Sequence, residues 1–173
     1  MFFSYRDVPY IPIGGIILGL VLVTRAAPIV PETVVPTDQV RSLEGLTQFR
    51  LEVLPLSRDL TSAGLDAERI QDGWADALQE EGFAVNDEST PLLELRISTL
   101  VDSNEPDMVA INLVLMLYQE VNVQRIRGKL SVPTYVRLQV GIENHRDMAR
   151  TIPGVLRIMR HRFLQDCQVA NDS

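Results

Sequence analysis

Apolar residues recur at every second position along several stretches of the chain, which is the pattern of strands with one buried face. Residues 48–54 and 93–99 show this alternation over short lengths, and residues 109–123 show it over a long one. We expect further strands at residues 83–85 and 135–142, and Pro133 predicts a sheet edge or a bulge near the start of the last one.

Two other stretches repeat apolar residues at the spacing of an α-helix. The first opens at Asp66, which suits an N-cap, and Gly82 is placed to end it. The second begins at about Thr151, with Pro153 tolerated in its first turn. Its expected inner stripe consists of Ile152, Val155, Leu156, Met159, Phe163 and Cys167.

The predicted order β-α-β-β-β-β-α indicates an α+β domain. Because strands that follow one another usually pair, we expect an antiparallel sheet with two helices on one face. The strand at 109–123 is also half apolar on its second face. That face therefore meets either a partner or the loops of its own domain.

Residues 11–24 form an uncharged apolar run, which approaches the roughly 20 residues of a membrane span once its flanks are added. A cleaved signal peptide is the alternative, but Asp7 and Pro9 make a poor leader and Arg25 lies awkwardly beside a cleavage site. A buried hairpin is the third possibility. We therefore predict a single transmembrane helix within an anchor at 1–25, an extended proline-rich tether at 26–44 and a globular domain at 45–173.

Gly15 and Gly19 form a G-x-x-x-G pair, which would let another membrane helix approach closely, although membrane helices are rich in glycine anyway. The run contains no histidine or carboxylate that could ligate a pigment or relay protons, so we expect no cofactor there. Its signal-like character favours the bacterial inner membrane as location, with the domain in the periplasm.

The net charge of −7 argues against nucleic acid as a partner. Arginines nevertheless cluster in the last predicted helix, and a basic patch on an acidic domain fits anionic lipid or an acidic subunit surface. A solvated helix face is the alternative. The candidate contact residues are Arg150, Arg157, Arg160 and Arg162.

Catalytic and metal-binding patterns are missing from the sequence. His145 and His161 are the only histidines, and Cys167, the single cysteine, falls on an apolar stripe that favours packing. No phosphate loop or dinucleotide fingerprint occurs. We therefore predict no catalytic residues, no metal and no cofactor, with an enzyme whose site is unrecognised as the least favoured reading.

Residues 43–100 resemble small α/β domains of bacterial envelope lipoproteins, of the lipopolysaccharide-transport and transport-auxiliary types. The resemblance is carried by the strand at 49–54, by GLDAERI (64–70), LQEEGFAV (78–85) and LLELRI (92–97). This chain lacks the lipobox cysteine of those families. Its architecture is also similar to accessory subunits of bacterial reaction-centre–light-harvesting and other bioenergetic complexes.

These observations together predict a non-catalytic, membrane-anchored accessory subunit that stabilises a larger integral-membrane complex. Its expected partners are integral-membrane subunits and membrane lipid, and a photosynthetic complex is one possibility. The alternative is an envelope transport or assembly factor that binds a lipid-like or protein client.

Overall fold

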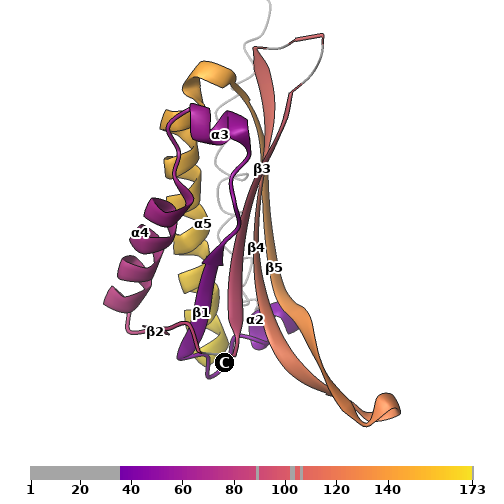
Figure 1. The fold of residues 1–173 in the computed structure, drawn as a ribbon. Helices are drawn as coiled ribbons and strands as arrows, with labels where there is room; N and C mark the ends of the chain where they lie inside the picture. Colours follow the sequence, from indigo (N-terminus) through magenta and orange to yellow (C-terminus); the bar gives the residue numbers. More distant parts are fainter. Residues whose placement is uncertain (1–35, 89, 102–103, 106, 173) are drawn as a thin grey trace, which may run out of the picture. The chain divides into compact units, whose positions relative to one another are not determined.

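The computed structural model describes residues 36–88, 90–101, 104–105 and 107–172, all within one compact unit that begins at Pro36. Figure 1 shows a sheet with helices packed beside it. In chain order the elements are α2 (Asp38–Arg41), β1 (Gln48–Val53), α3 (Arg58–Ser62), α4 (Ala67–Glu80), β2 (Ala84–Val85), β3 (Leu92–Val101), β4 (Met108–Val123), the 3₁₀ turn η2 (Gln124–Ile126), β5 (Gly128–Asn144), the 3₁₀ turn η3 (His145–Asp147) and α5 (Met148–Asn171).

The sheet is mixed, so the predicted antiparallel sheet is wrong. Its strand order is β2-β1-β3-β4-β5, and β1 pairs in parallel with both β2 and β3. Only the β3–β4 and β4–β5 pairs are antiparallel. The physical reason is the crossover through α4, because a helical connection returns the chain to the same end of the sheet and makes the next strand parallel.

The predicted transmembrane helix belongs to residues 1–25, which lie outside the described residues. Within the described part of the chain, no helix combines the length and the hydropathy that a membrane crossing requires. The fold class of the described residues is therefore corrected to a mixed five-stranded sheet with helices.

Helices α4 and α5 lie on the same side of the sheet (Figure 1). Alternate residues of β1, β3 and β4 point towards them and are buried, as the period of a strand requires. Every residue buried in this core is hydrophobic among those that the structure describes. The centre of the core on β3 and β4 consists of Leu93, Leu95, Ile97, Val109, Ile111, Leu113, Leu115 and Leu117.

Four aromatic rings join the two ends of the strand order through α5. Phe49 of β1 lies 5.5 Å from Phe83 and 6.2 Å from Phe163 of α5, measured between ring centroids. Tyr135 of β5 lies 5.6 Å from the same Phe163 in an edge-on arrangement. Such aromatic pairs stabilise a core beyond their buried area, so Phe163 fixes where α5 crosses the sheet.

Strand β5 begins seven residues earlier than the sequence pattern predicts, at Gly128 rather than Tyr135. Pro133 lies within it, opposite Tyr118, and the register of the two strands shifts between Leu117 and Tyr118. The bulge predicted from Pro133 is thus present, but the strand continues through it, because a bulge bends a strand without ending it.

The start of the described unit packs against β5 and α5. Leu43 is fully buried, and the Ser42 hydroxyl donates a hydrogen bond to the Thr134 carbonyl at 3.1 Å. Residues 36–44, which the sequence analysis assigned to the tether, therefore contribute α2 and a core side chain to this unit. The predicted division at 25/26 lies outside the described residues and stays a prediction.

The start of α4 provides a test of the local structure. The Asp66 carboxylate accepts a hydrogen bond from the Arg69 backbone N–H at 3.0 Å, which confirms the predicted N-cap. We expect Asp66→Ala to lower the free energy of unfolding by about 1 kcal/mol, because a backbone donor loses its partner. Asp66→Asn should retain most of the stability, and chemical denaturation measures both. Asp76→Ala, at an exposed position inside the same helix, is the control; an equal loss there would contradict a capping role.

Candidate functional site: the outer sheet face and edge strand β5

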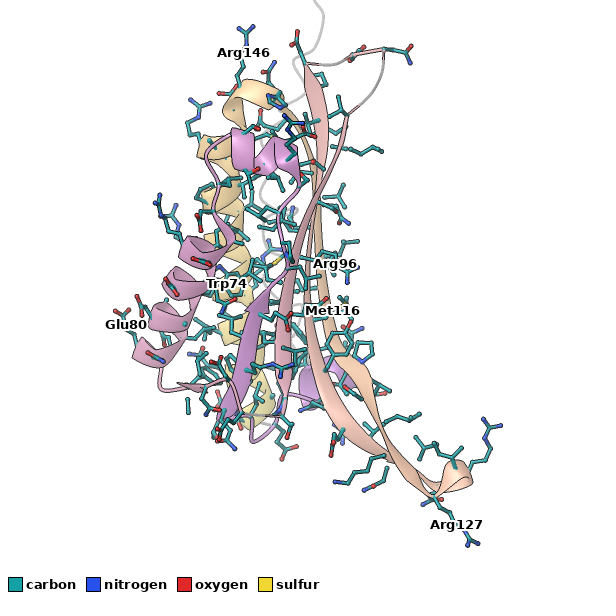
Figure 2. The ribbon with its side chains drawn as sticks, viewed as in Figure 1. Trp74, Glu80, Arg96, Met116, Arg127 and Arg146 are labelled. Atoms are coloured by element: carbon teal, nitrogen blue, oxygen red, sulfur yellow. The ribbon has the colours of Figure 1, made fainter. Side chains whose placement is uncertain are left out.

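The face of the sheet that points away from α4 and α5 divides into a charged part and an apolar part. Figure 2 shows Arg96 of β3 and Met116 of β4 projecting on this side. The charged part lies on β1 and β3, where Arg96 contacts Glu94 at 3.1 Å and Arg50 lies 3.9 Å from Glu52. These are neighbours on one outer face, since the register aligns Glu52 with Glu94.

The apolar part lies on β4 and β5, with Leu100 of β3 at one end. Register places Ala110 beside Ile142, Val114 beside Leu138 and Met116 beside Val136. Several of these side chains are largely exposed: Leu138 by 58%, Val140 by 59% and Ile142 by 72%. We call this surface the apolar strip; it consists of Leu100, Ala110, Val114, Met116, Val136, Leu138, Val140 and Ile142.

Strand β5 carries its apolar residues on the outer side and its polar residues towards the helices. Tyr135, Arg137 and Gln139 point towards α5, whereas the branched residues between them point away. A strand on a sheet with one covered face normally has the opposite arrangement. The exposed side of β5 therefore carries the apolar side chains, which are normally buried.

Strand β5 also forms the edge of the sheet, because β4 is its only neighbour among the strands that the structure describes. An edge strand presents backbone N–H and C=O groups that can pair with another extended chain. Residues 136–142 are exposed apart from Arg137. The site thus combines an available strand edge with the apolar strip beside it.

A polar cluster holds β5 in this orientation. The Tyr135 hydroxyl donates a hydrogen bond to Asp166 Oδ2 of α5 at 2.7 Å and accepts one from Arg137 Nε at 2.9 Å. Arg137 Nη2 also pairs with Asp166 Oδ2. Both charged side chains are partly buried, 27% and 20% exposed, so the pairing offsets part of the cost of removing them from water.

Burial raises the pKa of the Tyr135 phenol above its ordinary value; the Arg137 hydrogen bond opposes this shift, and Asp166 adds to it. Burial also raises the pKa of the Cys167 thiol to about 12, with a further contribution from the Asp166 charge. The thiol is therefore protonated at neutral pH, where it is a weak nucleophile and metal ligand. Cys167 lies in the core, as its apolar stripe predicted.

The structure brings three of the four predicted arginines together on α5. Arg157, Arg160 and Arg162 line one hollow of about 480 Å³ between α4 and α5, together with Glu80 and Glu81. Arg160 Nη1 also donates to the Gly73 carbonyl at 3.0 Å.

Arg150 lies apart from these three and pairs with Asp147 at 2.9 Å. Neighbouring carboxylates and the Gly73 carbonyl thus partly compensate the positive charge of the patch that the sequence predicted. Gly15 and Gly19 lie outside the described residues, so their packing role stays a prediction.

Titratable groups gather in the α4–α5 hollow, where Glu80, Glu81 and His161 lie with the arginines. Among the described residues no three histidine, cysteine or carboxylate side chains are placed to hold a metal ion. Glu143, the sequence neighbour of His145, instead accepts a hydrogen bond from the Thr151 hydroxyl at 3.0 Å. His161 is exposed at the rim of the α4–α5 hollow.

The sequence pattern indicated that β4 is partly apolar on both faces, but it did not lead to a prediction of the apolar strip on β5. The signal was present, because Val136, Leu138, Val140 and Ile142 alternate at the period of a strand. Such a pattern is normally read as a buried face. Only the position of α5 shows that these residues lie outside.

No family model matches the chain, and neither does any curated protein. A solved structure of a minor lipoprotein from Acinetobacter baumannii aligns over 73% of this chain and 90% of that chain, with 14% identity and a TM-score of 0.32. A likeness at this level assigns no function to this chain.

The Tyr135 cluster predicts how stability depends on pH. In the unfolded chain the thiol ionises above about pH 9 and the phenol above about pH 10, whereas burial keeps both protonated in the folded protein. The free energy of unfolding should therefore have its full value below about pH 9 and should fall as the pH rises further.

We expect Tyr135→Phe to lower the free energy of unfolding at pH 7 by about 1 kcal/mol, through its lost hydrogen bonds. It should also flatten the alkaline decline above pH 10. Urea denaturation between pH 7 and 11 measures both, with Tyr118→Phe on the outer face as the matched control. An alkaline decline that is the same in Tyr135→Phe as in the wild type would contradict this account.

Proposed function

We propose that this protein is a non-catalytic accessory subunit of the bacterial envelope that binds another protein through β5 and the apolar strip. The observation that carries the proposal is the orientation of β5, whose apolar side chains face outwards at the edge of the sheet. Single exposed apolar residues are ordinary, but a contiguous row of them marks an interaction site.

The kind of partner follows from the shape of this surface. A strand edge supplies backbone hydrogen bonds to an extended segment of another chain, and the alternate side chains beside it supply specificity. An incoming strand with apolar residues at every second position would extend both the ladder of hydrogen bonds and the apolar strip. We therefore propose an extended segment of a partner protein, within a larger complex, as the occupant.

The class of partner and the location follow from the sequence. Integral-membrane subunits remain the proposed partners because of the apolar run at residues 11–24 in the sequence. None of the described residues favours a photosynthetic complex over any other. The envelope assignment rests on the sequence resemblance of residues 43–100.

Site-specific photocrosslinking tests the docking surface in the full chain, expressed in its native host. A photoreactive residue at Leu138 should crosslink to a protein of one discrete mass, and one at Ile158 on α5 should not. The two positions are matched, since Leu138 is 58% and Ile158 is 52% exposed. Leu138→Lys should reduce recovery of that partner about tenfold or more, because it places an unpaired charge in an apolar contact.

Three results would count against the proposal. Equal crosslinking at both positions would mean that the contact is unspecific, and none at Leu138 would mean that the strip is unoccupied. Crosslinks only to a second copy of this chain would replace the accessory role with self-association. Thermal denaturation of Leu138→Lys should match the wild type, because the side chain is largely exposed.

A second candidate function is the binding of a lipid-like client, and the hollows between α4 and α5 favour it. Beside the first hollow, a second of about 410 Å³ is lined by Trp74, Leu156 and Pro153, and Arg157 and Arg160 border both. Apolar walls with cations at the rim suit an amphiphile that carries a negative head group.

This candidate predicts binding of a simple anionic amphiphile such as dodecyl phosphate. Replacing Arg157, Arg160 and Arg162 together by Gln should weaken binding about tenfold, since exposed ion pairs contribute roughly 0.5 kcal/mol each. Isothermal titration calorimetry measures it. Arg150→Gln, on the same helix but paired with Asp147, should bind as the wild type does. Unchanged affinity in the triple variant would leave these arginines as a solvated face.

A further inference from the structure

The far end of the β4–β5 hairpin extends beyond the rest of the sheet. Strand β3 pairs with β4 only as far as Tyr118, and from Gln119 to Val132 the hairpin is a two-stranded ribbon. We call residues 119–132 the hairpin arm. Figure 1 shows the arm bending away from the sheet, and Figure 2 shows Arg127 at its tip.

The base of the arm is anchored, which gives it a defined direction. The Thr134 hydroxyl donates to the Gln119 side-chain oxygen at 2.7 Å, and the register shift beside Tyr118 lies at the same level. A bulge at this place bends a ribbon and strengthens its twist. The tip turn closes through Arg127 in the left-handed conformation, with φ of 49°.

The two faces of the arm differ in character. Register pairs Val121 with Leu130, and Val123 and Val132 lie on the same face. The other face carries Glu120, Asn122, Ser131 and Lys129. At the tip Ile126 is 52% exposed, and Leu130 is 45% exposed. The arm is thus amphipathic, although an isolated two-stranded ribbon has no core of its own to bury its apolar face.

The charge of the arm is opposite to that of the chain. Its 14 residues contain Arg125, Arg127 and Lys129 against one carboxylate, Glu120, whereas the whole chain has a net charge of −7. Lys129 pairs with Glu120 at 3.0 Å. Arg125 and Arg127, which flank Ile126, form no ion pair with any described residue.

The uncompensated positive charge of Arg125 and Arg127 distinguishes the arm from the arginines of α5. There Glu80 and Glu81 share the hollow with the arginines, and Arg160 donates to a carbonyl. An anionic surface would attract the arm and repel the acidic remainder of the chain. Charge therefore favours an approach with the tip first.

We propose that the tip of the hairpin arm binds the surface of an anionic phospholipid bilayer, with Arg125 and Arg127 on phosphate head groups and Ile126 inserted between them. This contact goes beyond the proposed protein-docking function, because it uses a different part of the hairpin. Each basic residue near an anionic membrane contributes about 1 kcal/mol, and the apolar side chain adds insertion to the electrostatic attraction. High salt should weaken the contact by screening.

The test places an environment-sensitive fluorophore at the tip of the full chain. Ile126→Cys provides the labelling thiol, because the native Cys167 is buried. Val169→Cys on α5 is the control, since Val169 is 45% and Ile126 52% exposed and Val169 does not line the two α4–α5 hollows. With vesicles of phosphatidylglycerol and phosphatidylcholine, the label at 126 should shift to the blue and be quenched by spin-labelled lipid, and the label at 169 should not.

The arginines provide the second part of the test. Arg125→Gln with Arg127→Gln should raise the lipid concentration needed for half of the shift at position 126 about 30-fold, as should vesicles without anionic lipid. Equal quenching at positions 126 and 169 would overturn the proposal, because it would show that another part of the chain brings the whole protein to the membrane. A label at 126 that stays in water on anionic vesicles, or shifts only with an acidic protein, would overturn it as well.

Discussion

The packing of α5 against β5 determines which side chains of β5 are buried and which are exposed. Tyr135 packs edge-on against Phe163 and donates to Asp166, and Arg137 completes the same cluster. This orientation of the strand gives the buried hydroxyl and the two partly buried charges their partners, and the opposite orientation would take those partners away. The cluster therefore orients one side of β5 inwards and, with period 2, the other side outwards.

The outward side of β5 follows from that constraint. A strand cannot direct Tyr135 and Arg137 to the helix layer and also bury Val136, Leu138 and Val140 there. The apolar strip at the sheet edge is thus a consequence of how the core is closed. Natural edge strands usually avoid such a surface by charge or by covering it, and this is why the strip is the candidate for a partner contact.

The two proposed contacts lie on the same hairpin but depend on different physics. The strip at residues 136–142 is apolar and offers a strand edge, so its contact should be insensitive to salt. The arm is basic and narrow, and its contact with phosphate head groups is largely electrostatic. The α5 arginines, which the sequence made most prominent, are partly compensated by Asp147, by Glu80 and Glu81, and by the carbonyl of Gly73.

The sequence by itself determined the local elements whose signals lie within a few residues of one another. The cap at Asp66, the left-handed Gly82 that ends α4, the buried stripe from Ile152 to Cys167 and the alternating residues of β4 all follow from such short-range rules. Tertiary structure decided the parallel pairing of β1, the continuation of β5 through Pro133 and the outward orientation of Leu138 and Ile142. Each of these depends on which distant element covers which face of the sheet. Alternation along a strand indicates that its two faces differ, but it does not indicate which face α5 buries.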